Sequence, residues 1–209
     1  MKIGVICANG KAGRLIVKEA KDRGINVTAI VRKANETVAD KVIQKDLFEL
    51  TEADLQGFDV IINAFGTWKE DTLPLYSTTL SHLCNLLANT KIRLIIVGGA
   101  GSLYVDSEHT KQLFDGAEFP KEIKPLALAA GKSLNELRLR KDVIWTYVSP
   151  AIDFQVDGTR SGTYLLGGEE LTLNNKGESF ISYADYAIAI IDEAINGNNF
   201  QKRISVVAQ

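Results

Sequence analysis

Residues 2–33, KIGVICANGKAGRLIVKEAKDRGINVTAIVRK, decide the fold that we expect for this chain. Residues 3–7 are apolar and rich in β-branched side chains, which predicts a strand. Apolar residues at helical spacing then predict a helix over residues 11–23, and Gly24 is placed to end it. Residues 27–31 predict a second strand. A strand, a glycine turn, a helix and a second strand are the first unit of a dinucleotide-binding fold.

Strand-like and helix-like segments alternate along the rest of the chain, in one domain over residues 1–209. We predict further strands at residues 42–44, 59–64, 93–97, 143–148 and 204–207, and helices at residues 71–90, 123–141 and 182–194, the last with a capping box of Ser182 and Asp185. Apolar strands that alternate with helices predict an α/β, Rossmann-type doubly wound parallel sheet. Residues 153–180 break the rhythm, because they are rich in Gly, Thr and Asn, and we expect them to form a small cap-like region over the ligand crevice.

Composition excludes several classes of function. Apolar residues make up 45% of the chain and the net charge is −2. Without a basic run, nucleic acid is not an expected partner, and without an apolar run of about 20 residues, neither is a membrane. Cys7 and Cys84 lack ligand spacing, so we expect no metal site and a cytoplasmic protein without a disulfide.

The turn between the first strand and the first helix has the features of a pyrophosphate site. Amide groups in the first turn of a helix point at a bound anion, and the helix dipole favours its negative charge. Gly10 would let the main chain approach the phosphates, and Gly13 would let the helix pack closely on the sheet. Cys7 replaces the first glycine of the fingerprint. We expect it to make the turn with a negative φ, beside a conformationally tolerant Asn9, and to be buried and inert.

The end of the second strand favours NADP(H) over NAD(H). Arg32 stands where an NAD site would carry an acidic residue, and an arginine there accommodates the 2′-phosphate of NADP. The alternative is that Arg32 is an ordinary surface cation at a strand end.

Seven motifs, in this order and spacing, resemble the short-chain dehydrogenase/reductase superfamily. They are CANGKAG, AIVRK, KDLFE, DVIINAFG, LIIVGGAGSL, WTYVSPA and GESFISYADYAIAIIDE. The resemblance is to its atypical NAD(P)H-binding branch, which includes NmrA-like proteins, biliverdin reductase B-like flavin reductases and proteins proposed to be NADH–flavin reductases. It implies cofactor-binding roles for Asn9, Gly10, Lys11, Ala12, Gly13, Arg32, Asp46, Leu47, Ala64, Phe65, Gly66, Gly98, Gly99, Pro150 and Ala151.

These residues divide by the part of the cofactor that they would meet. Residues 9–13, in the turn and at the start of the helix, would line the pyrophosphate. The residues from Arg32 to Gly66 in this list would contact the adenosine side of the cofactor. The remaining four would border the nicotinamide half. For Asp46 an alternative stays open, namely a turn residue that bonds its own backbone.

The superfamily's usual acid is missing. Its members carry a Tyr-x-x-x-Lys pair in which the lysine lowers the pKa of a proton-donating tyrosine. Lys132 stands where such a lysine could fall, and it could still reach the nicotinamide ribose. Leu128 occupies the tyrosine position and cannot donate a proton. Ser102 and Tyr104 are the other candidate catalytic residues, with Tyr164 and His109 as weaker ones, and Trp68 is a candidate lid or stacking residue.

These absences favour direct hydride transfer to an electron-deficient ring, with solvent as the source of the proton. We therefore expect an NADPH-dependent reductase of a flavin, a quinone or a similar planar acceptor. The alternative is a non-catalytic NADP-binding redox sensor of the NmrA type that docks onto a regulator. A weaker third choice is an epimerase or dehydratase, which would need an acid–base pair. Residues 71–90 are a candidate face for a homodimer.

Overall fold

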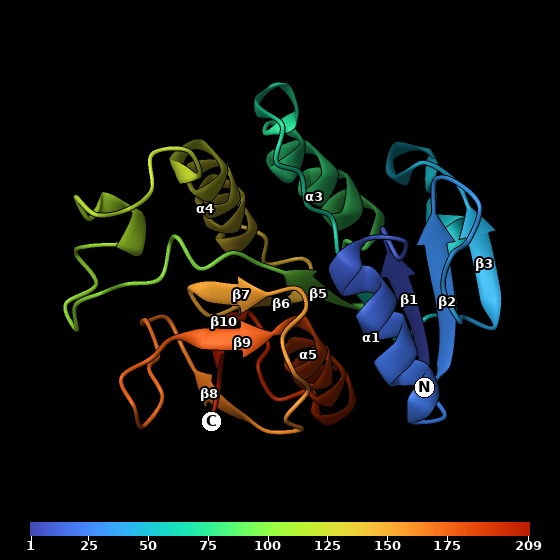
Figure 1. Cartoon of the computed structure of the whole chain (residues 1–209). Coiled ribbons are helices and arrows are strands. Elements are labelled where there is room, and N and C mark those ends of the chain that lie inside the picture. Colours follow the sequence, from blue (N-terminus) through green and yellow to red (C-terminus); the bar gives the residue numbers. More distant parts are fainter.

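The computed structural model describes the whole chain, residues 1–209. Its main sheet has eight strands in the order β3-β2-β1-β4-β5-β6-β10-β8 (Figure 1). The strands are β1 (Lys2–Ile6), β2 (Asn26–Val31), β3 (Lys41–Gln44), β4 (Val60–Asn63), β5 (Arg93–Val97), β6 (Ile144–Ser149), β8 (Tyr164–Gly167) and β10 (Lys202–Ala208). All neighbours pair in parallel except β8, which is antiparallel to β10. The predicted α/β class with a Rossmann-type parallel sheet is therefore confirmed.

Helices cover both faces of this sheet. The α-helices are α1 (Lys11–Asp22), α2 (Glu52–Leu55), α3 (Leu75–Leu86), α4 (Lys124–Arg138) and α5 (Tyr183–Asn196), and short 3₁₀ helices lie at Leu47–Glu49, Glu70–Thr72 and Leu113–Asp115. One face is covered by α1 and α5, and the other by α3 and α4 (Figure 1). None of these helices combines the length and the apolar character that a bilayer crossing requires.

Two helix ends follow the sequence signals. Gly24 has a φ of +70°, and the turn closes with a 3.0 Å bond from the N–H of Ile25 to the carbonyl of Ala20. Only glycine adopts this left-handed conformation at low cost. At the start of α5, the hydroxyl of Ser182 accepts a 2.9 Å bond from the N–H of Asp185, which is one half of the predicted capping box, whereas the carboxylate of Asp185 accepts bonds from Ser161 and Gly162 instead.

Two predicted segments differ from the structure. The helix expected over residues 71–90 is shorter, because a 3₁₀ turn precedes it, Pro74 lies at its N-terminal boundary, and it ends at Leu86. Within residues 153–180, β8 joins the main sheet as an edge strand, while β7 (Asp153–Gln155) pairs with β9 (Phe180–Ser182) in a separate two-stranded sheet. Part of this segment therefore completes the sheet.

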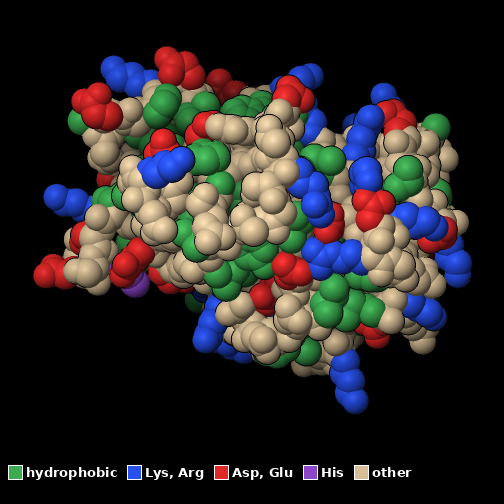
Figure 2. Space-filling model, turned by 60° about the horizontal axis from the view of Figure 1, so that its bottom comes forward, with side chains coloured by type: hydrophobic (Ala, Val, Ile, Leu, Met, Phe, Trp, Pro, Cys, Tyr) green, Lys and Arg blue, Asp and Glu red, His purple; other side chains and the backbone are tan.

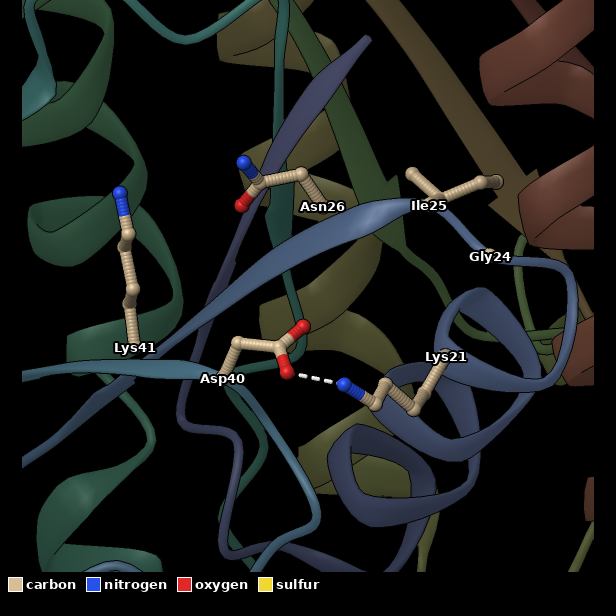
Figure 3. A pocket seen from close by; sticks show the side chains of 6 residues that line it. All are labelled: Lys21, Gly24, Ile25, Asn26, Asp40 and Lys41. Carbon is tan, nitrogen blue, oxygen red and sulfur yellow. Dashed lines mark hydrogen bonds and ion pairs between the residues drawn. The ribbon is translucent and has the colours of Figure 1, made fainter.

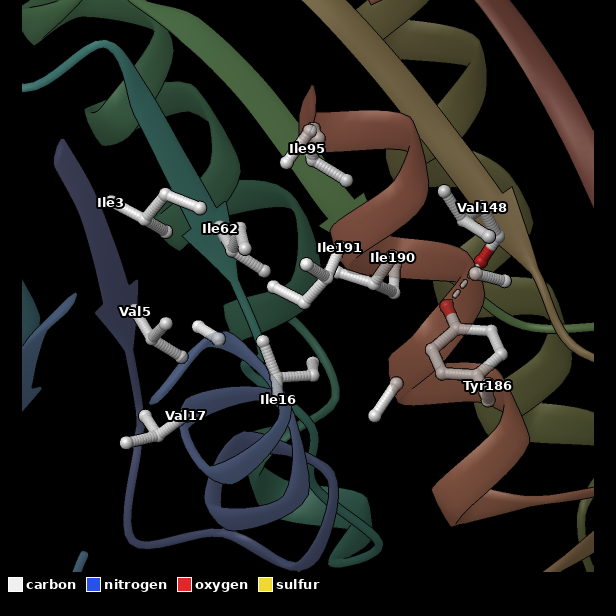
Figure 4. Packing of buried hydrophobic residues seen from close by; sticks show 14 of the residues in the cluster. Ile3, Val5, Ile16, Val17, Ile62, Ile95, Val148, Tyr186, Ile190 and Ile191 are labelled. Carbon is white, nitrogen blue, oxygen red and sulfur yellow. Dashed lines mark hydrogen bonds between the residues drawn. The ribbon is translucent and has the colours of Figure 1, made fainter. Parts of the chain in front are cut away.

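Side chains at alternate positions of each strand point to opposite faces of the sheet and pack into two separate hydrophobic cores. Ile3 and Val5 point toward α1 and α5, whereas Ile6 packs on the α3 and α4 side. Figure 4 shows Ile16 of α1 against Ile190 and Ile191 of α5, all three fully buried. Because burial of such a side chain contributes about 1.5–3 kcal/mol, this contact holds α1 firmly against α5 on this face of the sheet. The first turn of α1 is thus held at a defined place.

The strand order creates one topological switch point. The chain leaves β1 toward β2 on one side, while β4 pairs with β1 on the other. In open α/β sheets, ligands bind at such a point, in the crevice outside the carboxyl ends of the strands. Here that crevice lies beside the turn after β1 and the loop after β4.

Surface charges are mixed. On the face drawn in Figure 2, Lys and Arg side chains are interspersed with Asp and Glu side chains and do not gather into one patch of single sign.

Candidate functional site

The turn at residues 7–10 leads directly into α1 and leaves the start of that helix open. The N–H of Gly10 donates a 2.9 Å bond to the carbonyl of Cys7, which closes the turn. No side chain caps α1, and its first turn holds no acidic residue. The first N–H groups of a helix lack intrahelical acceptors, so Lys11, Ala12 and Gly13 present amides to an incoming anion.

Gly13 shows the close approach that the fingerprint requires. A β-carbon at this position would lie 2.6 Å from the carbonyl oxygen of Cys7 and 2.8 Å from the α-carbon of Ala8. At Gly10 the corresponding approach to Cys7 is 3.1 Å. A side chain at Gly13 would therefore push α1 away from β1, and the cradle at the helix start depends on its absence.

Cys7 corrects one expectation. Its φ is +58°, so the turn is left-handed at this residue and not made with a negative φ. A thiol side chain tolerates a conformation that glycine adopts more easily, and the surrounding turn and strand contacts hold it there. Burial raises the pKa of the Cys7 thiol to about 11, with smaller effects from Arg32 and Asp46. The thiol is therefore protonated at neutral pH, as expected for an inert residue.

Arg32 follows β2 directly and has a largely free side chain. Its side chain is 74% exposed and lies 3.8 Å from the carboxylate of Asp46. Asp46 also caps the 3₁₀ turn that follows, because its carboxylate accepts a 3.0 Å bond from the N–H of Phe48. Leu47 is buried, so only its main chain is available to a ligand. The end of β2 therefore offers Arg32 as an accessible cation, and the next residue, Lys33, is exposed as well.

The loop after β4 borders the same crevice. The N–H of Phe65 donates a 3.1 Å bond to the side chain of Asn63, and the Phe65 ring meets Tyr76 edge-on at 5.7 Å. Ala64 is half-buried and Gly66 is exposed. Trp68 is 76% exposed, so the stacking role expected of it stays a prediction.

At the end of β5 the main chain rests on a buried tyrosine. A β-carbon on Gly98 would lie 2.2 Å from Cε1 of Tyr147, and the N–H of Gly99 donates a 3.1 Å bond to the hydroxyl of that residue. Pro150 and Ala151, after β6, are both buried. Sequence reasoning missed Tyr147, since it falls inside a strand between other buried residues. The adjacent glycine pair is the one signal that a large side chain passes beneath.

Two of the three candidate catalytic residues have partners within the chain, Ser102 in the interior and Lys132 on an exposed part of α4. Ser102 is buried, and Arg203 donates a 3.0 Å bond to its hydroxyl, which differs from the substrate-facing hydroxyl expected there. The ammonium of Lys132 lies 2.9 Å from the carboxylate of Glu136. Leu128, one turn earlier on α4, is 46% exposed.

The third, Tyr104, stacks on His109 with ring centroids 4.5 Å apart. Its catalytic role stays a prediction. Tyr164 lies on β8 and donates a 2.8 Å bond to Asp192 of α5, which removes it from the crevice.

A hollow of about 290 Å³ lies at the opposite end of the strands, beside the amino ends of β2 and β3 (Figure 3). It is lined by Lys21, Gly24, Ile25, Asn26, Asp40 and Lys41, at the end of α1 and the starts of β2 and β3. Lys21 and Asp40 form an ion pair across it. It faces away from the carboxyl ends of the strands and takes no part in the site described above.

A family model and known proteins match this chain over nearly its whole length. The model described as NAD(P)H-binding matches residues 7–194. An uncharacterized Bacillus subtilis protein, YwnB, is 45% identical, and the match covers 100% of this chain and 99% of that protein.

Solved structures agree with this match. A Streptococcus pneumoniae protein, described as a candidate NADH-flavin reductase, is 52% identical with a TM-score of 0.98, over 100% of both chains. A Bacteroides thetaiotaomicron protein, described as a candidate epimerase, is 34% identical with a TM-score of 0.86, over 99% of this chain and 96% of that one.

Proposed function

The chain belongs to the NAD(P)H-binding family, and we propose that it is an NADPH-dependent reductase of a flavin, a quinone or a similar planar acceptor. When bound, NADPH supplies the hydride. The protein's own task is then to hold the two rings face to face and to keep the reacting atoms in line.

The start of α1 fits a dinucleotide. Its open amides suit a pyrophosphate, and Gly13 keeps the main chain close enough to form the cradle. Arg32 supports NADPH over NADH, because its exposed guanidinium can bind a 2′-phosphate with two parallel, charge-assisted bonds.

One observation supports hydride transfer to a planar acceptor over carbonyl chemistry. Leu128, a half-exposed apolar residue, lies one turn before Lys132 on α4. Carbonyl chemistry would need a proton donor at that position. Burial raises the pKa of Tyr147 to about 12 and also raises that of Tyr186, which makes both weaker acids. A flavin or quinone needs no such donor, because water can protonate the reduced ring.

The related proteins support this choice in part. The Streptococcus pneumoniae protein carries the description of a flavin reductase, although its name gives NADH as the reductant. The epimerase description of the Bacteroides protein implies acid–base chemistry, for which Leu128 offers no group.

The test is a turnover assay with purified protein, NADPH and FMN, followed by the loss of nicotinamide absorbance. We expect oxidation well above the rate in buffer, and faster with NADPH than with NADH. Saturable NADPH binding without turnover of a panel of flavins and quinones would overturn the reductase and indicate a sensor. The absence of any saturable nucleotide binding would overturn both.

A further inference from the structure

The side chain of Asn9 ties the phosphate turn to the loop after β2. Its Nδ2 donates a 2.7 Å bond to the carbonyl of Ala34, and its Oδ1 accepts a 2.9 Å bond from the N–H of Glu36. Both polar ends of the amide are thus used by the loop. The side chain therefore bridges two segments about 25 residues apart.

Arg14 adds a second link between the same two segments. Its Nε donates a 2.7 Å bond to the carbonyl of Asn9, and its guanidinium forms an ion pair with the carboxylate of Glu36. Asn9, Arg14 and Glu36 therefore form a closed bracket, which we call the turn–loop bracket. A planar guanidinium with several donors suits such a junction, because it can hold two partners in fixed directions.

Few other contacts hold residues 32–38 of the loop, whereas Asp40 near its end forms an ion pair with Lys21. Parallel pairing of β1 with β2 ends at Ile6 and Ile30, that of β2 with β3 ends at Val31 and Gln44, and β3 begins only at Lys41. Between them, Asn35 and Thr37 bond only to each other and to Ala39. The bracket is therefore what places the first half of this loop relative to the phosphate turn.

Arg32 lies at the start of that loop. Its guanidinium donates no hydrogen bond within the chain, and only the 3.8 Å approach of Asp46 accompanies it. Its reach toward an adenosine ribose thus depends on where its own main chain is held. A shift of the Arg32 main chain by about 1 Å is enough to lose a bidentate contact with a phosphate, because both hydrogen bonds must keep a narrow range of distance and angle.

We propose that the turn–loop bracket determines cofactor selectivity. Asn9, Arg14 and Glu36 act as positioning residues that hold Arg32 at the distance from the pyrophosphate turn that a 2′-phosphorylated adenosine needs. This inference rests on the proposed use of NADPH. It assigns the preference for NADPH to Arg32 together with the bracket residues. It therefore predicts that a change in the bracket can abolish the preference while Arg32 is intact.

The experiment compares Asn9→Ala with a matched control, Asn35→Ala. Both substitutions leave the charge unchanged and remove an asparagine that makes hydrogen bonds in this loop, but only the first breaks the link to the turn. Dissociation constants for NADPH, NADH and 2′,5′-ADP are measured by fluorescence titration. We expect Asn9→Ala to lower the NADPH-over-NADH preference about tenfold, the loss expected for two neutral hydrogen bonds, and to weaken 2′,5′-ADP similarly. Asn35→Ala should keep the wild-type preference.

The outcomes separate this inference from the proposed function. If the wild-type protein prefers NADPH and Asn9→Ala keeps that preference, the bracket proposal is wrong while the reductase stands. A wild-type protein without the preference overturns the bracket proposal and the proposed use of NADPH, whereas the reduction of a planar acceptor is decided by the turnover assay. Should Asn9→Ala not fold, hydrogen exchange of the wild-type protein decides. The amide of Glu36 should exchange more slowly with NADPH bound than with NADH bound, and equal exchange in both complexes would refute the bracket.

Discussion

The N–H of Gly99 donates a 3.1 Å hydrogen bond to the hydroxyl of Tyr147. The ring of the same tyrosine fills the space that a β-carbon of Gly98 would need. Tyr147 lies on β6, beside β5, and is fully buried. Tyr147 therefore fixes the position and direction of the main chain at Gly98 and Gly99, at the end of β5. We propose that the nicotinamide half of the cofactor lies there.

Tyr147→Phe removes this hydroxyl and keeps the ring. Because the N–H of Gly99 loses its acceptor, we expect NADPH binding to weaken by about 1 kcal/mol, or roughly fivefold. Binding of 2′,5′-ADP, which lacks the nicotinamide half, should not change. Titration of the variant with both nucleotides checks this, and an equal loss for the two would point to general loosening of the fold.

Arg32→Ala tests the cofactor preference directly. We expect NADPH binding to weaken by about 1–3 kcal/mol, the range for hydrogen bonds to charged groups, and NADH binding to be spared. Lys18→Ala is the control, because it removes the same charge from an exposed ion pair with Asp22 on α1. Equal losses for NADPH and NADH in the Arg32 variant, measured by calorimetry, would remove the case for NADPH.

The fold could be predicted because its signals are local. Apolar runs marked the parallel strands, Gly24 and Ser182 marked helix ends, and the alternation of strands with helices predicted the parallel α/β sheet. The strand β8 could not be predicted in the same way. It is an edge strand whose one neighbour, β10, comes much later in the chain and pairs with it antiparallel, a contact that no local pattern indicates.

The site was only partly predictable, because several of its features depend on contacts between distant residues. Gly13 could be identified from its spacing, since the need for a close approach is a property of the motif. The left-handed φ of Cys7 could not, because a side chain normally disfavours it. The guanidinium of Arg203 donates a hydrogen bond to the hydroxyl of Ser102, which is 101 residues away in the sequence. No sequence pattern near Ser102 indicates this contact.

Gly13→Ala should damage both stability and cofactor binding. The added methyl would meet main-chain atoms of residues 7 and 8 at 2.6–2.9 Å, which a flexible side chain could avoid but a strand cannot. We expect a loss of about 1–3 kcal/mol in the free energy of unfolding, as for other overpacked sites. Gly168→Ala is the control, because its β-carbon would meet nothing within 4 Å. Urea denaturation of both variants checks this, and equal stabilities would contradict the close packing.

The Cys7 thiol should react slowly at neutral pH. Burial raises the pKa of this thiol from 9.0 to about 11, so the protonated form is favoured and the reactive thiolate is about a hundredfold scarcer than in an ordinary cysteine. Alkylation by iodoacetamide, followed by peptide mass spectrometry, should keep accelerating above about pH 9, where a free thiol levels off. A plateau near pH 9 in protein that circular dichroism shows to be folded would refute this.

Leu128→Phe tests the class of reaction. If Leu128 borders a planar acceptor, a larger flat side chain should alter how that acceptor binds. Aromatic contacts are worth about 0.5–1.5 kcal/mol, so the KM for FMN should change by roughly two- to tenfold. Steady-state kinetics with FMN measure this, and NADPH binding serves as the internal control, since Leu128 lies on α4 and not at the phosphate turn.

The solvent isotope effect on the same variant distinguishes the two kinds of chemistry. Leucine and phenylalanine both lack a transferable proton, so proton delivery should come from water in either protein, and the isotope effect on turnover should be the same. Lys132, one turn away, keeps its ion pair with Glu136 in both. A large isotope effect that changes with the substitution would mean that a group near Leu128 delivers the proton. That result would favour an acid–base enzyme over direct hydride transfer to a flavin or quinone.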